Sequence, residues 1–377
     1  MSCFKKGLSL SAALLAGTLF LTACGGAPAS SASSVPASSV ASSEAAEQPE
    51  EPAMKYTQTP TVPTETYKEE ADFADFLSKA EPGLVIPGLA ENLIPQGMDQ
   101  CDETGILYIS GYYTTDGKSS AILAVDTATG ELTAEYLLLN AGGTPFDGHV
   151  GGVAVSEDTL YVSGQKQNGL YTICAIPLPA EGSHEVKLEQ TIPVPVSPSF
   201  LSDSHGYLWV GNFYHPGADY PLSDGMKYTT ASADGEDYGC YIMGYDLSKG
   251  SLSVADGDDY AQPDVVLVGP NKIQGVVVGE DDTVTLSQSY GRKNNASLLH
   301  YSLALGETLD TMLTVQGRDV PGYILDSKRL KESVTAMPMT EALADAKDGG
   351  IYVLFESGAI HYANGTFRTD HVWKIKF

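Results

Sequence analysis

The chain of 377 residues carries 48 acidic and 21 basic residues, which gives a formal net charge of −27. Nucleic acids and anionic lipid surfaces attract basic proteins, so this balance argues against DNA, RNA or a polybasic membrane contact. The length allows one large domain or several smaller ones.

The N-terminus reads as an export signal. Two lysines precede an apolar run over residues 8–21, which is too short and wrongly flanked for a stable membrane span. The ending Leu-Thr-Ala-Cys resembles the bacterial lipobox, and this resemblance implies that Cys24 is diacylated and becomes the first mature residue. An ordinary signal peptide over residues 1–24 with an incidental cysteine is the alternative. We therefore expect an exported protein, anchored to the outer face of the bacterial cytoplasmic membrane or cell envelope.

Residues 25–60 consist mainly of Ser, Ala, Pro and Glu. Such a segment cannot bury a core, so we expect a disordered tether. The folded domain is expected over residues 61–377. Its first element is predicted to be an amphipathic helix over residues 65–80, which caps the outside of the domain.

Three cysteines remain in the expected mature domain besides Cys24, an odd number for an exported protein: Cys101, Cys174 and Cys240. The sequence contains no CxxC pair and no spacing of Cys and His that is typical of a metal site. We expect three buried free thiols, and a bond between Cys174 and Cys240 stays open.

A degenerate repeat follows from residue 96 onward. Five segments read as second strands of a repeating unit: LYISGYY (107–113), LYVSGQK (160–166), LWVGNFY (208–214), VTLSQSY (284–290) and IYVLFES (351–357). Each has a candidate first strand shortly before it and a third strand shortly after it. Fourth strands are expected at residues 132–138, 189–194, 264–268 and 309–315. Short strands at regular spacing with Gly-containing turns predict an all-β fold.

Repeats of four antiparallel strands favour a β-propeller. Five units are recognisable, so we expect five blades, and six is the alternative because residues 316–336 offer room for a degenerate blade. The fifth unit ends at Phe377 with its third strand. The segment LVIP at residues 84–87 is therefore predicted to close the ring as the missing fourth strand, which also removes an exposed sheet edge.

The strand pattern over residues 84–377 resembles the secreted propellers of the YVTN/NHL and gluconolactonase-like (regucalcin-like) group. That resemblance implies a divalent cation held at the channel mouth by Glu, Asn and Asp. Only one carboxylate occupies the corresponding ring here, so lactonase activity and a cofactor are not expected. The acidic stretches 234–239 and 255–260 suggest weak Ca²⁺ binding, but neither matches DxDxDG with its downstream Glu.

In a propeller the first strands begin, and the second strands end, at one face, which we call the top face. Nine polar and aromatic residues are expected there as ligand-binding residues: Gln96, His149, Asn212, Tyr214, Gln274, Gln288, Tyr290, Arg292 and Glu356. The long connection 213–239 contains four tyrosines and is expected to fold over the channel mouth. Alternatively, the buried amides bind one another and channel waters.

These residues predict a monomeric ligand-binding module for a small molecule, glycan or peptide. Two other classes stay open. A hydrolase or lyase would use His149 as a base, or Glu356 with Asp99 or Asp203 as a carboxylate pair. A protein-interaction scaffold would instead expose a broad apolar rim.

Overall fold

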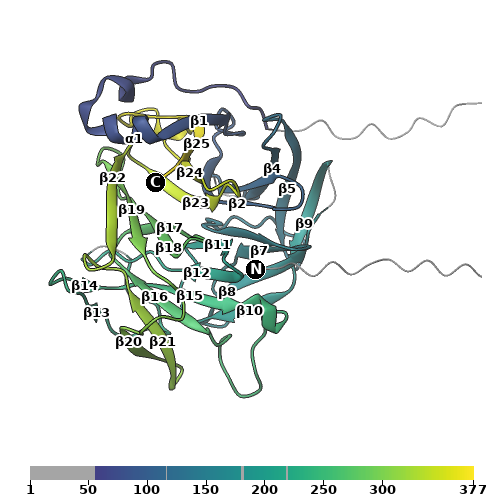
Figure 1. Cartoon of the computed structure of the whole chain (residues 1–377). Coiled ribbons are helices and arrows are strands. Elements are labelled where there is room, and N and C mark those ends of the chain that lie inside the picture. The colour runs from purple at the N-terminus through teal and green to yellow at the C-terminus, as the bar shows by residue number, and fades with distance from the viewer. Residues whose placement is uncertain (1–55, 116, 180–181, 218–219) are drawn as a thin grey trace, which may run out of the picture. The chain divides into compact units, whose positions relative to one another are not determined.

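The structure is a computed structural model that describes residues 56–377, apart from residues 116, 180–181 and 218–219 (Figure 1). The predicted signal peptide, most of the predicted tether and the lipidation site Cys24 lie outside the described residues. Among the helices in the described ranges, none is both long and apolar enough to cross a membrane.

Five sheets form a ring, so the predicted five-bladed β-propeller is confirmed. Figure 1 views the ring along its axis, with first strands such as β2, β11, β17 and β23 near the centre. From the axis outward, blade 1 consists of β2 (Ile94–Gln100), β3 (Ile106–Tyr112), β4 (Ala121–Asp126) and β5 (Leu132–Asn140). Blade 2 consists of β6 (Val153–Ser156), β7 (Thr159–Ser163), β8 (Tyr171–Pro177) and β10 (Thr191–Val194).

The remaining blades follow the same antiparallel pattern. Blade 3 consists of β11 (Phe200–Ser204), β12 (Tyr207–Gly211), β15 (Cys240–Asp246) and β16 (Val265–Gly269). Blade 4 consists of β17 (Ile273–Val278), β18 (Thr283–Gln288), β19 (Ala296–Ser302) and β22 (Leu330–Ala336). Blade 5 consists of β23 (Thr340–Asp345), β24 (Ile351–Phe355), β25 (His371–Ile375) and β1 (Ala80–Val85). A 3-10 turn, η3 (Leu247–Lys249), follows β15, and another, η4 (Ile360–Tyr362), follows β24.

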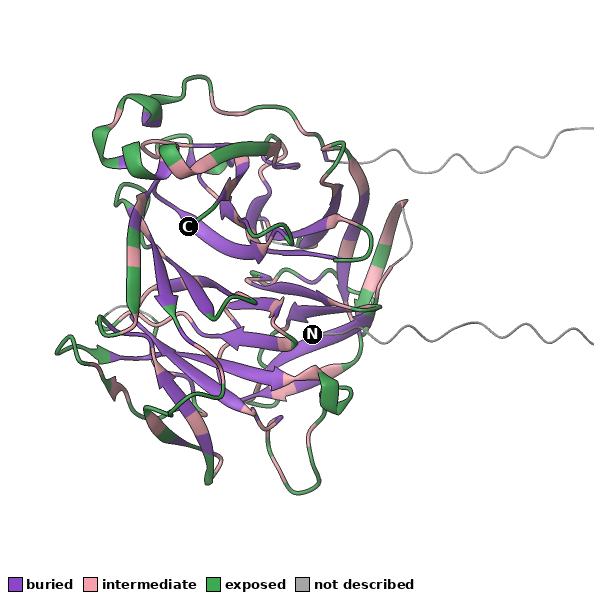
Figure 2. Ribbon diagram, viewed as in Figure 1, coloured by how far each residue is buried: buried purple, intermediate pink, exposed green. Residues whose placement is uncertain are grey.

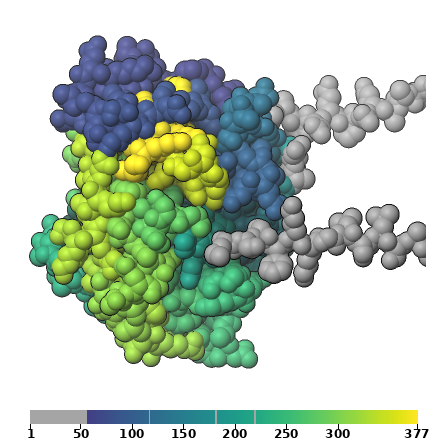
Figure 3. All heavy atoms as spheres, in the orientation of Figure 1, coloured from purple at the N-terminus to yellow at the C-terminus, as the bar shows by residue number. Residues whose placement is uncertain are grey.

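The ring closes through its N-terminal strand, as predicted. β1 pairs antiparallel with β25, with Ala80 opposite Ile375 and Val85 opposite His371. The strand begins four residues earlier than the predicted segment 84–87. Figure 3 shows the consequence, with the N-terminal residues of the described chain packed beside the yellow C-terminal strands.

The prediction for the outer strand of blade 4 was wrong. That strand is β22, whereas residues 309–315 contribute β20 (Thr311–Val315), which pairs with β21 (Arg318–Ile324). β21 then pairs in parallel with β16 and extends blade 3. Blade 1 gains β9 (Gly182–Leu188) in the same way, parallel to β5. In both cases the chain pairs with the outer strand of the previous blade before it forms the outer strand of its own blade. Residues 316–336 therefore contribute β21 to blade 3 and β22 to blade 4, and they form no sixth blade.

The core consists of apolar clusters between neighbouring blades. Five large clusters occupy the five blade interfaces, and each contains side chains from strands of both neighbouring blades. Cys101, Cys174 and Cys240 are buried and unpaired. Figure 2 shows the blade strands largely buried and the exposed residues concentrated in the connections.

Serines in the repeated second-strand motif join adjacent blades. Ser110 Oγ donates to the carbonyl of Val150 at 2.8 Å, and Ser163 Oγ donates to the carbonyl of Pro198 at 2.7 Å. Ser287 Oγ, at the same position of its motif, donates to the carbonyl of Glu341 at 2.6 Å. Each of these buried hydroxyls therefore satisfies a backbone carbonyl at the top of the next blade.

The predicted helix over residues 65–80 is wrong in extent. The segment forms two 3-10 turns, η1 (Thr66–Glu69) and η2 (Ala71–Phe73), and a six-residue helix, α1 (Ala74–Lys79). Phe73 and Phe76 are fully buried in an apolar cluster that they share with strands of blades 4 and 5. Helix formation stops at Ala80 because that residue pairs with Ile375, and strand pairing here outweighs local helix propensity.

Residues before the expected domain start at residue 61 also pack on the propeller, beginning with Tyr56. Tyr56 is buried, and its backbone N–H donates to the carboxylate of Glu135 at 3.2 Å. Farther along, the backbone N–H groups of Thr61 and Val62 donate to the carboxylate of Asp370 at 2.7 and 2.8 Å. The segment before β1 thus links blade 1 to blade 5.

Candidate functional site

A cavity of about 490 Å³ opens at the top face, and we call it the top pocket. Residues at the starts of β2, β17 and β23 and at the end of β24 meet there. The structure places six of the nine expected residues in its lining: Gln96, His149, Gln274, Tyr290, Arg292 and Glu356. Their joint presence follows from the strand order of a propeller, in which these positions share one face.

Irregularities at the starts of the first strands orient the polar residues. The β2–β3 register shifts between Pro95 and Gly97, and the β17–β18 register shifts between Ile273 and Gly275. The extra residues are Gln96 and Gln274, which both line the top pocket. A bulge at a strand end commonly re-aims a side chain in this way.

The glycines after these bulges are required by close packing. A Cβ on Gly97 would lie 2.7 Å from the backbone nitrogen of Val153 in blade 2. A Cβ on Gly275 would lie 2.6 Å from the backbone nitrogen of Leu343 in blade 5. In each Gln-Gly pair, the glutamine places its side chain at the pocket, and the glycine allows the backbone to pack closely against a neighbouring blade.

A third bulge adds a residue that the sequence analysis missed. The β23–β24 register shifts between Thr340 and Leu343, and Glu341, which lies within this irregular stretch, lines the top pocket. Alignment of Glu341-Ala342 with the two Gln-Gly pairs would have indicated it, because a small residue follows the pocket residue in each case. Glu341 is buried, with 5% of its surface exposed.

Glu341 and Glu356 form a carboxyl pair at the floor of the pocket. Gln96 Nε2 donates to Glu356 Oε2 at 2.9 Å, and Gln274 Nε2 donates to Glu341 Oε1 at 3.3 Å. The two carboxyl groups also hydrogen-bond to each other. A row of four side chains, Gln96–Glu356–Glu341–Gln274, therefore crosses the floor from blade 1 through blade 5 to blade 4.

Burial controls the protonation of this pair. Burial raises the pKa of Glu356 to about 7, although hydrogen bonds from Tyr362, Glu341 and Gln96 and the charge of Arg292 oppose the shift. Burial and the neighbouring charge of Glu356 raise the pKa of Glu341 well above its usual range. These raised pKa values favour a pair in which Glu341 and Glu356 share one proton, as expected for two carboxyl groups in one site.

Aromatic rings form much of the wall. Tyr112 stacks on His149 with ring centroids 4.2 Å apart and planes 15° apart. The Arg292 guanidinium lies 4.6 Å from the centre of the Tyr362 ring. Burial lowers the pKa of His149, so its imidazole is neutral at neutral pH. Seven Tyr and Phe residues line the pocket in all: Tyr112, Phe146, Tyr171, Phe213, Tyr220, Tyr290 and Tyr362.

Three expected residues lie outside the top pocket. Asn212 is buried and uses its amide within the fold, donating to the carbonyl of Gly239 at 3.0 Å and accepting from the backbone N–H of Tyr241 at 2.8 Å. Tyr214 packs against Gly239. Gln288 faces an adjoining cavity of about 450 Å³, which shares only Ser289 and Tyr290 with the top pocket.

The connection 213–239 only partly meets its expected role. Phe213 and Tyr220 line the top pocket, and their rings meet edge to face at 4.9 Å. Tyr238 is buried in the core within a short hairpin of β13 (Thr230–Ala231) and β14 (Asp237–Tyr238). Tyr228 packs toward the edge of blade 3, where its hydroxyl accepts from the backbone N–H of Thr314 at 3.1 Å. Of the four tyrosines in this connection, only Tyr220 therefore lines the top pocket, and the other three pack elsewhere.

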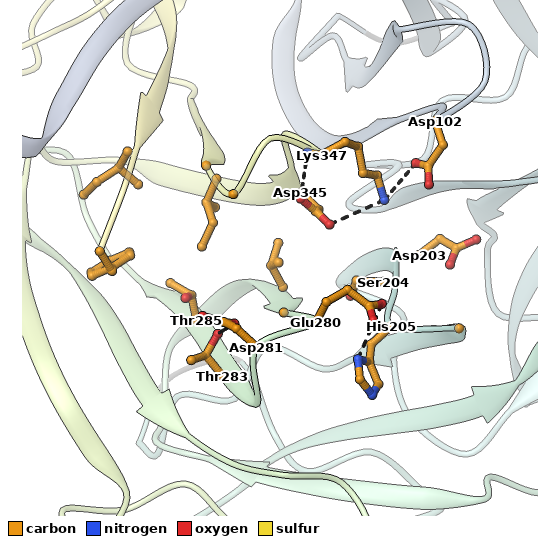
Figure 4. Close-up of a pocket in the computed structure, with 18 of the residues that line it drawn as sticks. Asp102, Asp203, Ser204, His205, Glu280, Asp281, Thr283, Thr285, Asp345 and Lys347 are labelled. Atoms are coloured by element: carbon orange, nitrogen blue, oxygen red, sulfur yellow. Dashed lines mark hydrogen bonds and ion pairs between the residues drawn. The ribbon is translucent and has the colours of Figure 1, made fainter. Parts of the chain in front are cut away.

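A second cavity, of about 1040 Å³, opens at the opposite face, and we call it the bottom pocket (Figure 4). Eight carboxylates and two lysines line it, and Lys347 lies among the acidic groups. Lys347 Nζ lies 2.8 Å from Asp102 Oδ1 and 3.6 Å from Asp345 Oδ2. Although burial lowers the pKa of Lys347, Asp102, Asp99 and Asp345 raise it above its usual value.

Asp99 is fully buried and joins three blades. Its Oδ2 accepts from the backbone N–H groups of Val155 at 2.9 Å and Asp203 at 3.1 Å, and its Oδ1 accepts from the backbone N–H of Gln100 at 3.0 Å. Burial and the charge of Asp203 raise the pKa of Asp99 well above its usual range. Asp99 and Asp203 thus lie toward the bottom face, away from Glu356, and do not form the carboxylate pair considered from the sequence.

The described residues contain no group of three or more His, Cys, Asp or Glu side chains arranged to hold a metal ion. In the acidic stretch 234–239, the Asp234 carboxylate instead accepts hydrogen bonds from the Tyr238 hydroxyl at 2.6 Å and the Ser327 backbone at 3.2 Å.

No protein-family model and no curated protein match the chain. Among solved structures, the chain is similar to hydrazine synthase of Kuenenia stuttgartiensis, at 13% identity, with 69% of this chain and 55% of that chain covered and a TM-score of 0.32. It therefore spans about half of that chain.

Two smaller proteins are also similar to it. The PQQ-bound aldose sugar dehydrogenase of Streptomyces coelicolor has 13% identity, with 78% of this chain and 96% of that chain covered and a TM-score of 0.43. The periplasmic gluconolactonase PpgL of Pseudomonas aeruginosa has 14% identity, with coverages of 69% and 64% and a TM-score of 0.30. The sheet topology of this chain itself shows the propeller fold that the expected resemblance to gluconolactonase-like propellers implied. The likenesses to solved structures assign no activity to this chain.

Proposed function

We propose that this protein is a ligand-binding β-propeller whose top pocket takes a small neutral glycan. The observation that carries the proposal is the hydrogen-bonded row Gln96–Glu356–Glu341–Gln274 on the floor of a cavity walled by aromatic rings. Sugars present hydroxyl groups around their edge and C–H groups on their faces. Fixed polar groups can bind the former, and aromatic rings can pack against the latter.

The charge of the top pocket favours a neutral ligand. Its charged lining residues are Lys166, Arg292 and the two glutamates. Because the glutamate pair shares a proton, the lining carries a small net charge although the whole chain is strongly acidic. The volume of about 490 Å³ lies within the usual range for small-molecule sites.

The amide groups also have free capacity for a ligand. In the described part of the chain, the side-chain oxygens of Gln96 and Gln274 accept no hydrogen bond, while their nitrogens donate to the glutamates. Each amide is thus held in place by its nitrogen and offers its oxygen as an acceptor for a sugar hydroxyl. This preorganisation reduces the entropic cost of binding.

The proposal is tested by isothermal titration calorimetry on the full-length protein with the monosaccharides and disaccharides of the gluco, manno, galacto and xylo series. We expect at least one sugar to bind, and the double variant Gln96→Ala, Gln274→Ala to bind it at least tenfold more weakly, about 1.4 kcal/mol. Gln190→Ala, an exposed amide on blade 2, is the matched control and should bind like the wild type. Absence of binding by every sugar, or unchanged binding by the double variant, would refute the proposal.

Export and membrane anchoring through Cys24 belong to the same proposal, and they rest on the sequence of residues 1–24. Metabolic labelling with a radioactive fatty acid should label the wild-type protein in a bacterial host and leave Cys24→Ser unlabelled. Equal labelling of both would exclude Cys24 as the acylated residue.

A further inference from the structure

We propose that the glycan is an oligosaccharide, which extends from the top pocket across Tyr290 into the adjoining cavity. This inference rests on the proposed function and specifies its ligand. The adjoining cavity measures about 450 Å³, and we call it the amide ledge because Asn271, Gln288, Asn294 and Asn295 line it. Ser289 and Tyr290 line both cavities, so the two cavities adjoin at these residues.

The ledge belongs to the top face by its place in the fold. Gln288 ends β18, Asn294 and Asn295 precede β19, and Asn271 precedes β17. The ledge therefore lies beside the top pocket along blade 4, and a linear ligand can pass from one cavity to the other without crossing a blade.

The amides of the ledge present acceptors. Gln288 Nε2 donates to the carbonyl of Asn271 at 2.8 Å, and Asn294 Nδ2 donates to the carbonyl of Tyr290 at 2.8 Å. Asn295 Nδ2 donates to the carboxylate of Asp72 at 3.1 Å. Within the described ranges, the side-chain oxygens of these three residues accept no hydrogen bond. Three residues of the ledge can therefore accept hydrogen bonds from a ligand.

Tyr290 provides the platform between the two cavities. Its side chain has 41% of its surface exposed. The ring of His215 meets it edge to face at 4.4 Å, and the ring of Phe213 lies 6.2 Å away at 31°. The Asn294 hydrogen bond to its carbonyl fixes the turn that carries it. An exposed ring held in this way can pack against the C–H face of a sugar unit at the junction.

The acceptors distinguish a glycan from a peptide. An extended peptide offers one backbone N–H donor per residue, whereas a sugar unit offers several hydroxyl donors close together. The charged groups of the ledge are Lys272 and Glu236, which carry opposite signs. A neutral, hydroxyl-rich chain therefore fits the ledge better than a peptide or a charged polymer.

The test compares the affinity of full-length protein for sugars of one to four units in the gluco, manno, galacto and xylo series. We expect the tetrasaccharide of the preferred series to bind at least tenfold more tightly than its monosaccharide. In Tyr290→Ala this gain should fall to less than threefold, and Asn295→Ala should reduce it partly. Tyr228→Ala is the matched control because Tyr228 is equally exposed, at 42%, and contacts neither cavity. Thermal melting verifies that each variant is folded.

The outcomes separate the two proposals. If a monosaccharide binds and longer chains gain nothing, or if the gain survives in Tyr290→Ala, the extended site is overturned and the top pocket stands. If no sugar of any length binds the wild-type protein, both proposals fall. A length-dependent gain that Tyr290→Ala abolishes and Tyr228→Ala preserves supports the oligosaccharide site.

Discussion

The top and bottom pockets lie at the two faces of the same ring and differ in what lines them. The top pocket has seven Tyr and Phe residues and two carboxylates. The bottom pocket is about twice as large, but it has eight acidic side chains and a single Phe, the C-terminal Phe377. The larger cavity therefore lacks the aromatic surface that a glycan would need, and size alone does not identify the better ligand site.

The two faces also use their buried acids differently. At the top, Glu341 and Glu356 bind amide side chains at the edge of a cavity. Toward the bottom, Asp99 binds backbone N–H groups of three blades, and Lys347 bridges Asp102 and Asp345. The top acids thus line an open cavity, whereas Asp99 and the ion pairs of Lys347 connect different blades. Three measurements of stability test this division.

The largest effect is expected for Asp99→Ala. Removal of its carboxylate leaves three backbone N–H groups without partners, two of them in other blades, so we expect a loss of about 3 to 5 kcal/mol in the free energy of unfolding. Asp99→Asn keeps one oxygen acceptor and should lose less. Urea denaturation measures both. A loss below about 1 kcal/mol for Asp99→Ala would mean that Asp99 does not hold the blades together.

A smaller effect, of opposite sign, is expected for Glu341→Gln. The folded-state pKa of Glu356 is raised to about 7, and that of Glu341 is raised well above its usual range. The folded state therefore binds more protons than the unfolded state, and the pair's contribution to stability is present below about pH 4.5 and lost as the pH rises through about 7. A glutamine at position 341 can still donate a hydrogen bond to Glu356 and accept one from Gln274, but the pair then contains only one ionisable group.

We expect Glu341→Gln to match the wild type at pH 5 and to be more stable by about 1 to 3 kcal/mol at pH 8. Denaturation curves at both pH values measure the difference. Glu185→Gln, on the exposed edge strand β9, is the control and should follow the wild type at both. A variant that is less stable than the wild type at pH 8 would contradict the shared proton.

The smallest effect is expected for Lys347→Met. Its removal leaves the acids of the bottom pocket without their central cation, so we expect a loss of about 1 to 2 kcal/mol at pH 7. The loss should shrink toward pH 4, because burial raises the pKa of Asp203, which then becomes protonated. Arg292→Ala in the top pocket removes an exposed cation and should change stability by less than about 0.5 kcal/mol. Equal losses for both variants would remove the contrast between the faces.

Much of the fold could be predicted because its signals are local. Each second-strand motif, such as LYISGYY around Ser110, carries its own alternation of residues and its own turn. The closing role of the N-terminal strand followed from a blade that lacked one strand. The fourth strand of blade 4 was misassigned because 309–315 and 330–336 both read as strands, and only the packing of β21 on β16 separates them.

The candidate site was predicted only in part, for a related reason. Position within a strand indicated that Gln96, Gln274 and Glu356 share one face. It could not indicate that Asn212 binds Gly239, because that contact depends on how the connection 213–239 folds back. It missed Glu341 because the bulge in β23 shifts the pocket position by one residue, and a shift of one residue moves a side chain to the other face.

The sequence by itself thus determined the number and type of the blades, the closure of the ring and the face that carries the top pocket. These follow from patterns within about ten residues, where backbone alternation and turn geometry decide the structure. Only the tertiary structure decided the pairing of Glu341 with Glu356, the extension of blades 1 and 3, and the position of the amide ledge beside the top pocket. Each of these depends on contacts between strands whose register is set by packing against another blade.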